Sequence, residues 1–127
     1  MRHMPSPEQI TQTVNRYLEL VAAGSADEIV ELYASDATIE DPVGGGEVHI
    51  GRQAIHGFYS NIENLKRKSE LVTLRVGGHE AAYFWNLTVD FGGSASRIEI
   101  ISVMTFDDEA KITSMKAYWG PENMTQL

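Results

Sequence analysis

The chain contains no cysteine, and its 10 lysines and arginines are outnumbered by 18 aspartates and glutamates. Without cysteine it can form neither disulfides nor thiolate metal sites, a composition that suits a reducing cytoplasm. The net charge of −8 at pH 7 disfavours nucleic acid and anionic membranes as partners, because both attract clustered lysine and arginine. We therefore expect a cytoplasmic protein that binds neither.

Long apolar runs and metal-binding patterns are also missing. No stretch approaches the roughly 18 apolar residues of a membrane span. Residues 1–5 lack the apolar segment of a signal peptide. His49, His56 and His79 are scattered without metal-ligand spacing, so we expect loop or surface roles for them and predict no metal. Residues 44–46 are three glycines without the Lys-Ser/Thr of a phosphate-binding loop, which predicts a flexible rim loop.

What the chain does have is enough apolar material for one core. Apolar residues make up 43% of its 127 residues, and no internal repeat is visible. This length is close to the commonest domain size. We predict a single domain over residues 1–127.

The first half of the chain carries helix signals. Ser6 and Gln9 have the spacing of a capping box, Pro7 suits the first helical turn, and Gly24 marks the end. The apolar face recurs at helical spacing at Ile10, Val14, Tyr17 and Val21.

Two further helices are predicted before the chain changes character. Ser25 and Glu28 repeat the capping-box spacing and begin a second helix. Its apolar positions are Ile29, Val30, Leu32 and Tyr33. A third helix is predicted over about residues 51–62, with Ile55, Phe58, Tyr59 and Ile62 on one side.

From about residue 70 the apolar residues alternate with period two, which is typical of strands. Turns are predicted at 92–94 and 107–110, and the last strand covers about 111–119. The basic run 66–68 is expected to be a solvated turn. The seven or so residues at each end show no periodicity and are expected to fray.

Helices followed by consecutive strands predict an α+β fold. We expect three N-terminal helices packed on a strongly curved antiparallel or mixed sheet. Such a sheet would form a cone closed at one end, with an apolar ligand pocket at its mouth.

Asp41 stands out because it precedes Pro42, which favours an extended backbone. In a strand, Ala37, Ile39 and Asp41 share one face, so the carboxylate points where the apolar side chains point. An inward carboxylate is costly unless it is hydrogen-bonded or takes part in chemistry. The alternative is a turn or cap aspartate ahead of Pro-Gly.

Four more polar groups interrupt apolar stripes: Tyr17, Tyr33, Tyr59 and Ser102. Any one of them alone is explained as a core residue whose hydroxyl bonds to nearby backbone. Together with Asp41 they supply what carbonyl chemistry needs, namely a base and donors for a developing oxyanion.

These segments resemble the ketosteroid isomerases, members of the nuclear-transport-factor-2-like superfamily. The resemblance covers roughly residues 10–120. The similar segments are Arg-Tyr-Leu-Glu-Leu-Val at 16–21, Tyr-Ala-Ser-Asp-Ala-Thr-Ile-Glu-Asp-Pro at 33–42, the Gly-Arg to Phe-Tyr helix at 51–59, and the strands at 101–106 and 115–119. The block at 33–42 is fairly specific, whereas Gly-Arg occurs across the superfamily.

The resemblance implies a cofactor-free steroid Δ-isomerase acting on an apolar, steroid-like molecule, and a homodimer packed through its sheet. Asp41 would be the general base and Tyr17 the main oxyanion donor, with Tyr33 and Tyr59 behind Tyr17. The apolar walls would come from Val14, Leu18, Trp85, Phe91, Met104, Met115 and, near the base, Trp119.

One position departs from the family pattern. The resemblance implies an oxyanion hole made of a Tyr and a protonated Asp, yet the Asp position holds Ser102. Loss of one oxyanion donor typically costs about 2.7–4 kcal/mol, or roughly 10²–10³ in rate. Ser102 therefore favours one alternative, a steroid- or lipid-binding protein without turnover. A second alternative is a cyclase or hydratase acting on a polycyclic ketone, because this fold hosts several chemistries.

Overall fold

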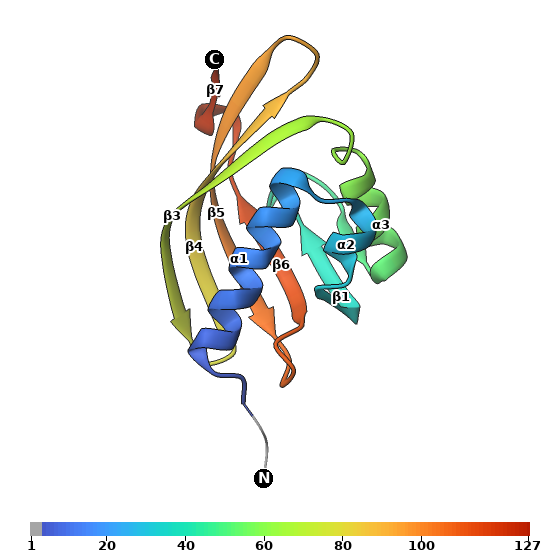
Figure 1. The fold of residues 1–127 in the computed structure, drawn as a ribbon, viewed down its shortest axis with the longest axis vertical. Helices are drawn as coiled ribbons and strands as arrows, with labels where there is room; N and C mark the ends of the chain where they lie inside the picture. Colours follow the sequence, from blue (N-terminus) through green and yellow to red (C-terminus); the bar gives the residue numbers. More distant parts are fainter. Residues whose placement is uncertain (1–3) are drawn as a thin grey trace.

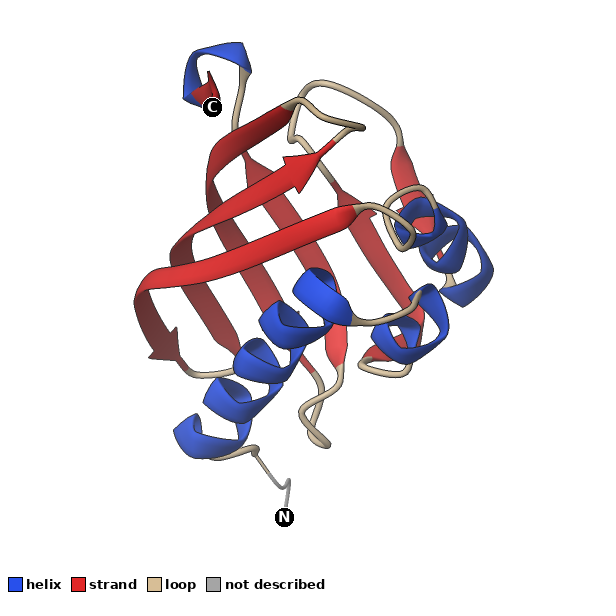
Figure 2. Ribbon diagram, turned by 45° about the horizontal axis from the view of Figure 1, so that its top comes forward, coloured by secondary structure: helices blue, strands red, loops and turns tan. Residues whose placement is uncertain are grey.

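The computed structural model describes residues 4–127, which form one curved mixed sheet with three α-helices against its concave side (Figures 1 and 2). The strand order is β2-β1-β6-β5-β4-β3, and β7 pairs with β5. The sheet is not closed, since β2 and β3 form its two edges. Within residues 4–127, no helix is long and apolar enough to cross a membrane. The predicted α+β fold with three helices is confirmed.

The helices begin where their capping residues predict. In α1 (Pro7–Ala23) the Ser6 hydroxyl accepts the Gln9 N–H, and the Gln9 side chain accepts the Ser6 N–H. The same reciprocal pair, Ser25 with Glu28, starts α2 (Ala26–Val30). The third helix, α3 (Arg52–Ser60), follows the short strand β2.

The strands are β1 (Tyr33–Glu40), β2 (Val48–Ile50), β3 (Lys66–Gly77), β4 (Glu80–Asp90), β5 (Ala95–Phe106), β6 (Ile112–Tyr118) and β7 (Met124–Gln126), with a 3-10 turn at Pro121–Asn123 before β7. Strands β3 to β6 are antiparallel neighbours. Strand β1 pairs with β6 in parallel, which makes the sheet mixed. This parallel pairing brings the end of β1 beside the end of β6.

Three local predictions were wrong. Helix α2 stops at Val30, and Tyr33 is the first residue of β1, where it pairs with Ile112. The basic run Lys66–Lys68 belongs to β3, because its backbone pairs with the end of β4. Residues 124–126 form β7 instead of fraying; of the opposite tail, residues 1–3 lie outside the described residues.

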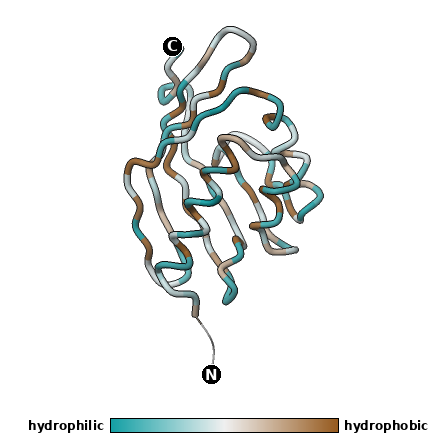
Figure 3. The backbone as a smooth tube through the Cα atoms, in the orientation of Figure 1, coloured by the Kyte–Doolittle hydropathy of each residue, from teal (hydrophilic) through white to brown (hydrophobic). Residues whose placement is uncertain are grey.

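The core lies between the helices and the concave face of the sheet. Hydropathy alternates along the strands (Figure 3), and the inward positions of β5 are Ile98, Ile100, Ser102, Met104 and Phe106. Ser102 is fully buried, and apart from the tyrosines it is the one buried polar residue within residues 4–127. An inward polar group in this row requires a hydrogen-bond partner.

Candidate active site

Three tyrosine hydroxyls form a hydrogen-bonded chain on the helix side of the core. Tyr59 of α3 is central, with its Oη 2.8 Å from that of Tyr17 on α1 and 2.7 Å from that of Tyr33 at the start of β1. All three side chains are buried, and burial is the main cause that raises the pKa of each. The hydroxyls therefore stay protonated at neutral pH and can donate hydrogen bonds.

Asp41 lies in the bend directly after β1 and is half-buried. Trp119, which follows β6, donates its indole N–H to Asp41 Oδ1 at 2.7 Å. Burial raises the pKa of Asp41, while the Trp119 hydrogen bond and the charge of His49 act in the opposite direction. A carboxylate whose pKa is raised by burial binds a proton more readily than one in water.

Ser102 on β5 is held by a second tryptophan. Trp85 on β4 donates its indole N–H to Ser102 Oγ at 2.9 Å, and both side chains are buried. Tyr83, directly opposite Ser102 in the β4–β5 pair, donates to Met104 Sδ at 3.7 Å. The serine, which is isolated in the sequence, thus belongs to a polar cluster.

Asp41 and Ser102 lie at the same level of the sheet. Glu40 is opposite Lys116, and Ala117, the next residue of β6, is opposite Ser102. Because neighbouring strands are about 4.8 Å apart, the backbones at Asp41 and Ser102 are about 10 Å apart. The two residues are therefore two strands apart at one level of the sheet.

Tyr17 approaches the same region from helix α1. Its ring packs edge-on against Trp85, with ring centroids 6.4 Å apart and an interplanar angle of 77°. After burial and the neighbouring Tyr33, the charge of Asp41 also raises the pKa of Tyr17. The structure thus brings Asp41, Tyr17 and Ser102 together.

The apolar residues predicted to line the site divide into two groups. Buried between the helices and the sheet are Val14, Leu18, Trp85, Met104 and Met115, with Trp119 half-buried beside Asp41. Phe91 does not join them and is 58% exposed. Strand β4 ends at Asp90, so Phe91 falls in the hairpin turn, where it leaves the inward alternation.

Two neighbours of the site were missed in the sequence. Tyr83 belongs to the inward stripe of β4, and its position opposite Ser102 requires the strand register. His49, expected in a loop or on the surface, lies in β2, where it pairs with Ile39 of β1. The centroid of its ring is 5.1 Å from that of Phe58. No local signal in the sequence reveals that His49 lies close enough to act on Asp41.

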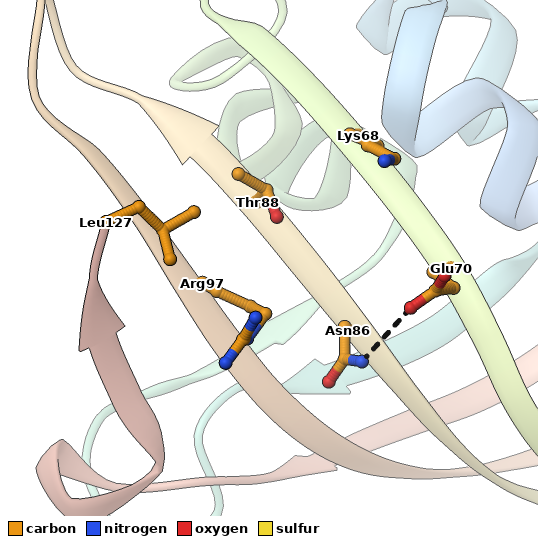
Figure 4. A pocket seen from close by; sticks show the side chains of 6 residues that line it. All are labelled: Lys68, Glu70, Asn86, Thr88, Arg97 and Leu127. Carbon is orange, nitrogen blue, oxygen red and sulfur yellow. Dashed lines mark hydrogen bonds between the residues drawn. The ribbon is translucent and has the colours of Figure 1, made fainter.

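The convex face of the sheet carries a separate polar hollow of about 250 Å³. Figure 4 shows its lining of Lys68, Glu70, Asn86, Thr88, Arg97 and Leu127, with Asn86 donating to Glu70. The lining residues on β3, β4 and β5 alternate with those that face the core, so this hollow opens away from Asp41. The apolar pocket on the concave side stays a prediction.

Comparison with known proteins gives concordant matches. The sequence matches the SnoaL-like domain over residues 14–115. It is 44% identical over 116 residues to a steroid Δ-isomerase from Nocardioides simplex, covering 91% of this chain and 94% of that protein.

Two solved structures have a similar fold. One is SalBIII, described as an epoxide hydrolase/cyclase-like enzyme in pyran ring formation in the polyether salinomycin, with a TM-score of 0.84 and 29% identity over 94% of this chain and 97% of that chain. The other, RV0760c from Mycobacterium tuberculosis, has a TM-score of 0.88 at 21% identity over 97% of this chain and 99% of that chain, and it shows the fold alone.

Proposed function

Because the chain belongs to the SnoaL-like domain family and, within it, to the ketosteroid isomerases, we propose that it is a steroid Δ-isomerase with Asp41 as its base. The reaction moves a Δ5 double bond into conjugation with a 3-keto group. It is redox-neutral and needs only a proton acceptor and stabilisation of an oxyanion. The observation that carries the proposal is a half-buried carboxyl of raised pKa in the same region as two buried hydroxyl groups: Tyr17, whose pKa its charge helps to raise, and Ser102, two strands away.

Asp41 removes a proton from C4, between the carbonyl and the double bond. The C4–H electron pair moves into the ring and gives a dienolate with negative charge on the 3-oxygen. Asp41 then returns the proton at C6, so the C4–H bond broken is replaced by a C6–H bond and the double bond lies between C4 and C5. The raised pKa of Asp41 reduces the free-energy gap to the weakly acidic C4–H.

Tyr17 and Ser102 stabilise the dienolate oxygen. When Tyr33 donates to Tyr59 and Tyr59 donates to Tyr17, the Tyr17 proton is free to donate to the ligand. Each hydroxyl that donates into the next strengthens the terminal donor. Hydrogen bonds that strengthen as charge develops lower the barrier more than they tighten substrate binding.

The ligand we propose is an apolar, steroid-like molecule lying on the concave face. The side chains there are Val14, Leu18, Met104 and Met115, and burial of the apolar surface of a rigid polycycle against them supplies affinity. These side chains pack against one another in the structure. Entry of a ligand therefore requires some of these side chains to move.

The convex face supports a homodimer, which we propose as the assembly. Phe84, Ile101 and Tyr118 lie side by side on β4, β5 and β6. Ile101 is 52% and Tyr118 45% exposed, an apolar strip that a second copy would cover. Sedimentation should give a dimer, whereas a monomer at micromolar concentration would contradict this assembly.

The absence of cysteine supports a cytoplasmic location.

A second candidate, a cyclase or hydratase acting on a polycyclic ketone, is favoured by the similarity to SalBIII and by His49 near Asp41. A histidine beside the carboxylate can serve as the second acid that such chemistry needs. Against it, the relative with the higher identity is a steroid Δ-isomerase.

The test is the ultraviolet appearance of the conjugated enone from a Δ5-3-ketosteroid with the wild-type protein. Turnover well above background is expected. Saturable binding of a phenolic steroid without turnover would instead indicate a steroid-binding protein. If the protein shows no turnover and no binding, the steroid assignment is overturned and the cyclase or hydratase is favoured.

A further inference from the structure

Trp85 contacts both of the proposed oxyanion donors. Its indole N–H donates to Ser102 Oγ at 2.9 Å, and its ring packs edge-on against that of Tyr17 at 6.4 Å between centroids. Trp85 is 3% exposed and Ser102 is fully buried, so water does not compete for the indole N–H. One side chain thus joins the sheet side of the site to the helix side.

The direction of the Trp85–Ser102 hydrogen bond is fixed by chemistry. An indole nitrogen can only donate, whereas a hydroxyl has one proton and two lone pairs. The Ser102 oxygen must therefore be the acceptor, and its proton must point elsewhere. A hydroxyl that accepts one hydrogen bond also becomes a stronger donor in the next. Without the indole, a strand serine can turn its proton to a neighbouring carbonyl.

The Ser102 proton has a resting acceptor in the cluster. Tyr83 lies opposite Ser102, and although burial raises the pKa of Tyr83, its hydrogen bond with Ser102 lowers it. The Tyr83 hydroxyl directs its own proton to Met104 Sδ. Its oxygen is thus free to accept from Ser102 until a more basic oxygen arrives. A dienolate oxygen is more basic than a phenol and would take that proton.

We propose that Trp85 is a positioning residue for the oxyanion site. It holds the Ser102 hydroxyl as a donor and fixes its position relative to Tyr17. The second oxyanion donor is then a tryptophan–serine pair, which supplies through two side chains what a protonated carboxyl supplies through one. This inference rests on the proposed isomerase function for its kinetic consequences.

The test is a double-mutant cycle with Trp85→Phe, Ser102→Ala and the double variant. Each single change should lower kcat by about tenfold, the effect of one net hydrogen bond, with KM changed less than about threefold. The double variant should be no slower than Ser102→Ala, because Trp85 acts through the serine. Losses that multiply in the double variant, or unchanged kcat in Trp85→Phe, would overturn the proposal.

A second variant at position 85 separates the loss of the indole N–H from the loss of packing. Benzothienylalanine at position 85 keeps the shape of the tryptophan but has no N–H, and it should reproduce the kcat of Trp85→Phe. Wild-type kcat with this isostere would assign the effect of Trp85→Phe to packing and overturn the proposal.

A binding arm separates this inference from the proposed function. The ionised fraction of a bound phenolic steroid, read from its ultraviolet absorption, reports donor strength at the oxyanion site without turnover. It should fall in Trp85→Phe and Ser102→Ala alike, with no further fall in the double variant. If wild type does not isomerise the ketosteroid but shows this pattern, the isomerase proposal fails and the role of Trp85 stands. An unchanged ionised fraction in Trp85→Phe overturns the role of Trp85.

Discussion

The helix side and the sheet side of the site are built from different hydrogen-bond donors. On the helix side, Tyr33, Tyr59 and Tyr17 pass hydrogen bonds from hydroxyl to hydroxyl. On the sheet side, each functional group has an indole partner, Trp119 for Asp41 and Trp85 for Ser102. Hydroxyls can both donate and accept, whereas indoles can only donate.

This difference assigns a task to each side. A chain of hydroxyls can share a developing charge, since each member strengthens the next. An indole N–H instead fixes its partner as an acceptor. For the Asp41 carboxyl that role favours the ionised form, which is the form of a base. For the Ser102 hydroxyl the same role leaves the proton free for a ligand.

The largest effect among these donors is expected on the helix side. Tyr17→Phe should lower kcat by about 10²–10³, the usual cost of one oxyanion donor. Tyr59→Phe is the matched control, since it removes a hydroxyl from the same chain one step from the ligand, and its loss should be smaller. Steady-state kinetics with the Δ5-3-ketosteroid measures both. A larger loss for Tyr59→Phe than for Tyr17→Phe would reverse the order of the chain.

A smaller, pH-dependent effect is expected at the indole that holds the base. Removing the N–H in Trp119→Phe should raise the pKa of Asp41 further, because the hydrogen bond favours the carboxylate. Since the ionised form is active, the acid limb of kcat/KM against pH should move to higher pH. Trp85→Phe is the control and should lower the plateau without moving that limb. An acid limb that moves to lower pH in Trp119→Phe would contradict the role of Trp119.

The smallest effect is on stability and comes from the burial of Asp41. Its folded pKa is raised, so between the unfolded and folded pKa values the native state binds more protons, and stability falls as pH rises through that window. Asp41→Asn should therefore melt a few degrees above wild type at pH 7. The difference should close as pH falls toward the ordinary aspartate pKa of about 3.9. An equal or lower melting temperature at pH 7 would show that the ionised Asp41 does not destabilise the fold.

Local chemistry made much of the fold predictable. Ser6 with Gln9 and Ser25 with Glu28 mark both helix starts, because capping is set by residues three apart. Tertiary pairing overrode local pattern at Tyr33, whose spacing continues a helix while its backbone joins β6. The end of the chain had no periodicity of its own, and residues 124–126 became a strand by pairing with β5.

The candidate site was predictable as a set of residues but not as a network. Asp41, Tyr17 and Ser102 each interrupt an apolar stripe, so the pattern of each segment predicts an inward polar group. The hydrogen-bond partners of these residues could not be predicted in this way. The sequence pattern predicts Trp85 only as an apolar wall residue, and the register of β4 and β5 is needed to place it beside Ser102. His49 likewise depends on the pairing of β2 with β1.

The most direct measurement of the role of Asp41 compares Asp41→Asn with wild type in two assays, enone formation and binding of a phenolic steroid. Enone formation should fall by about 10²–10⁴, the range for loss of a general base. The phenolic steroid should bind the variant at least as tightly as it binds wild type, because the oxyanion donors Tyr17 and Ser102 are untouched. Turnover within tenfold of wild type, with binding retained, would contradict Asp41 as the base.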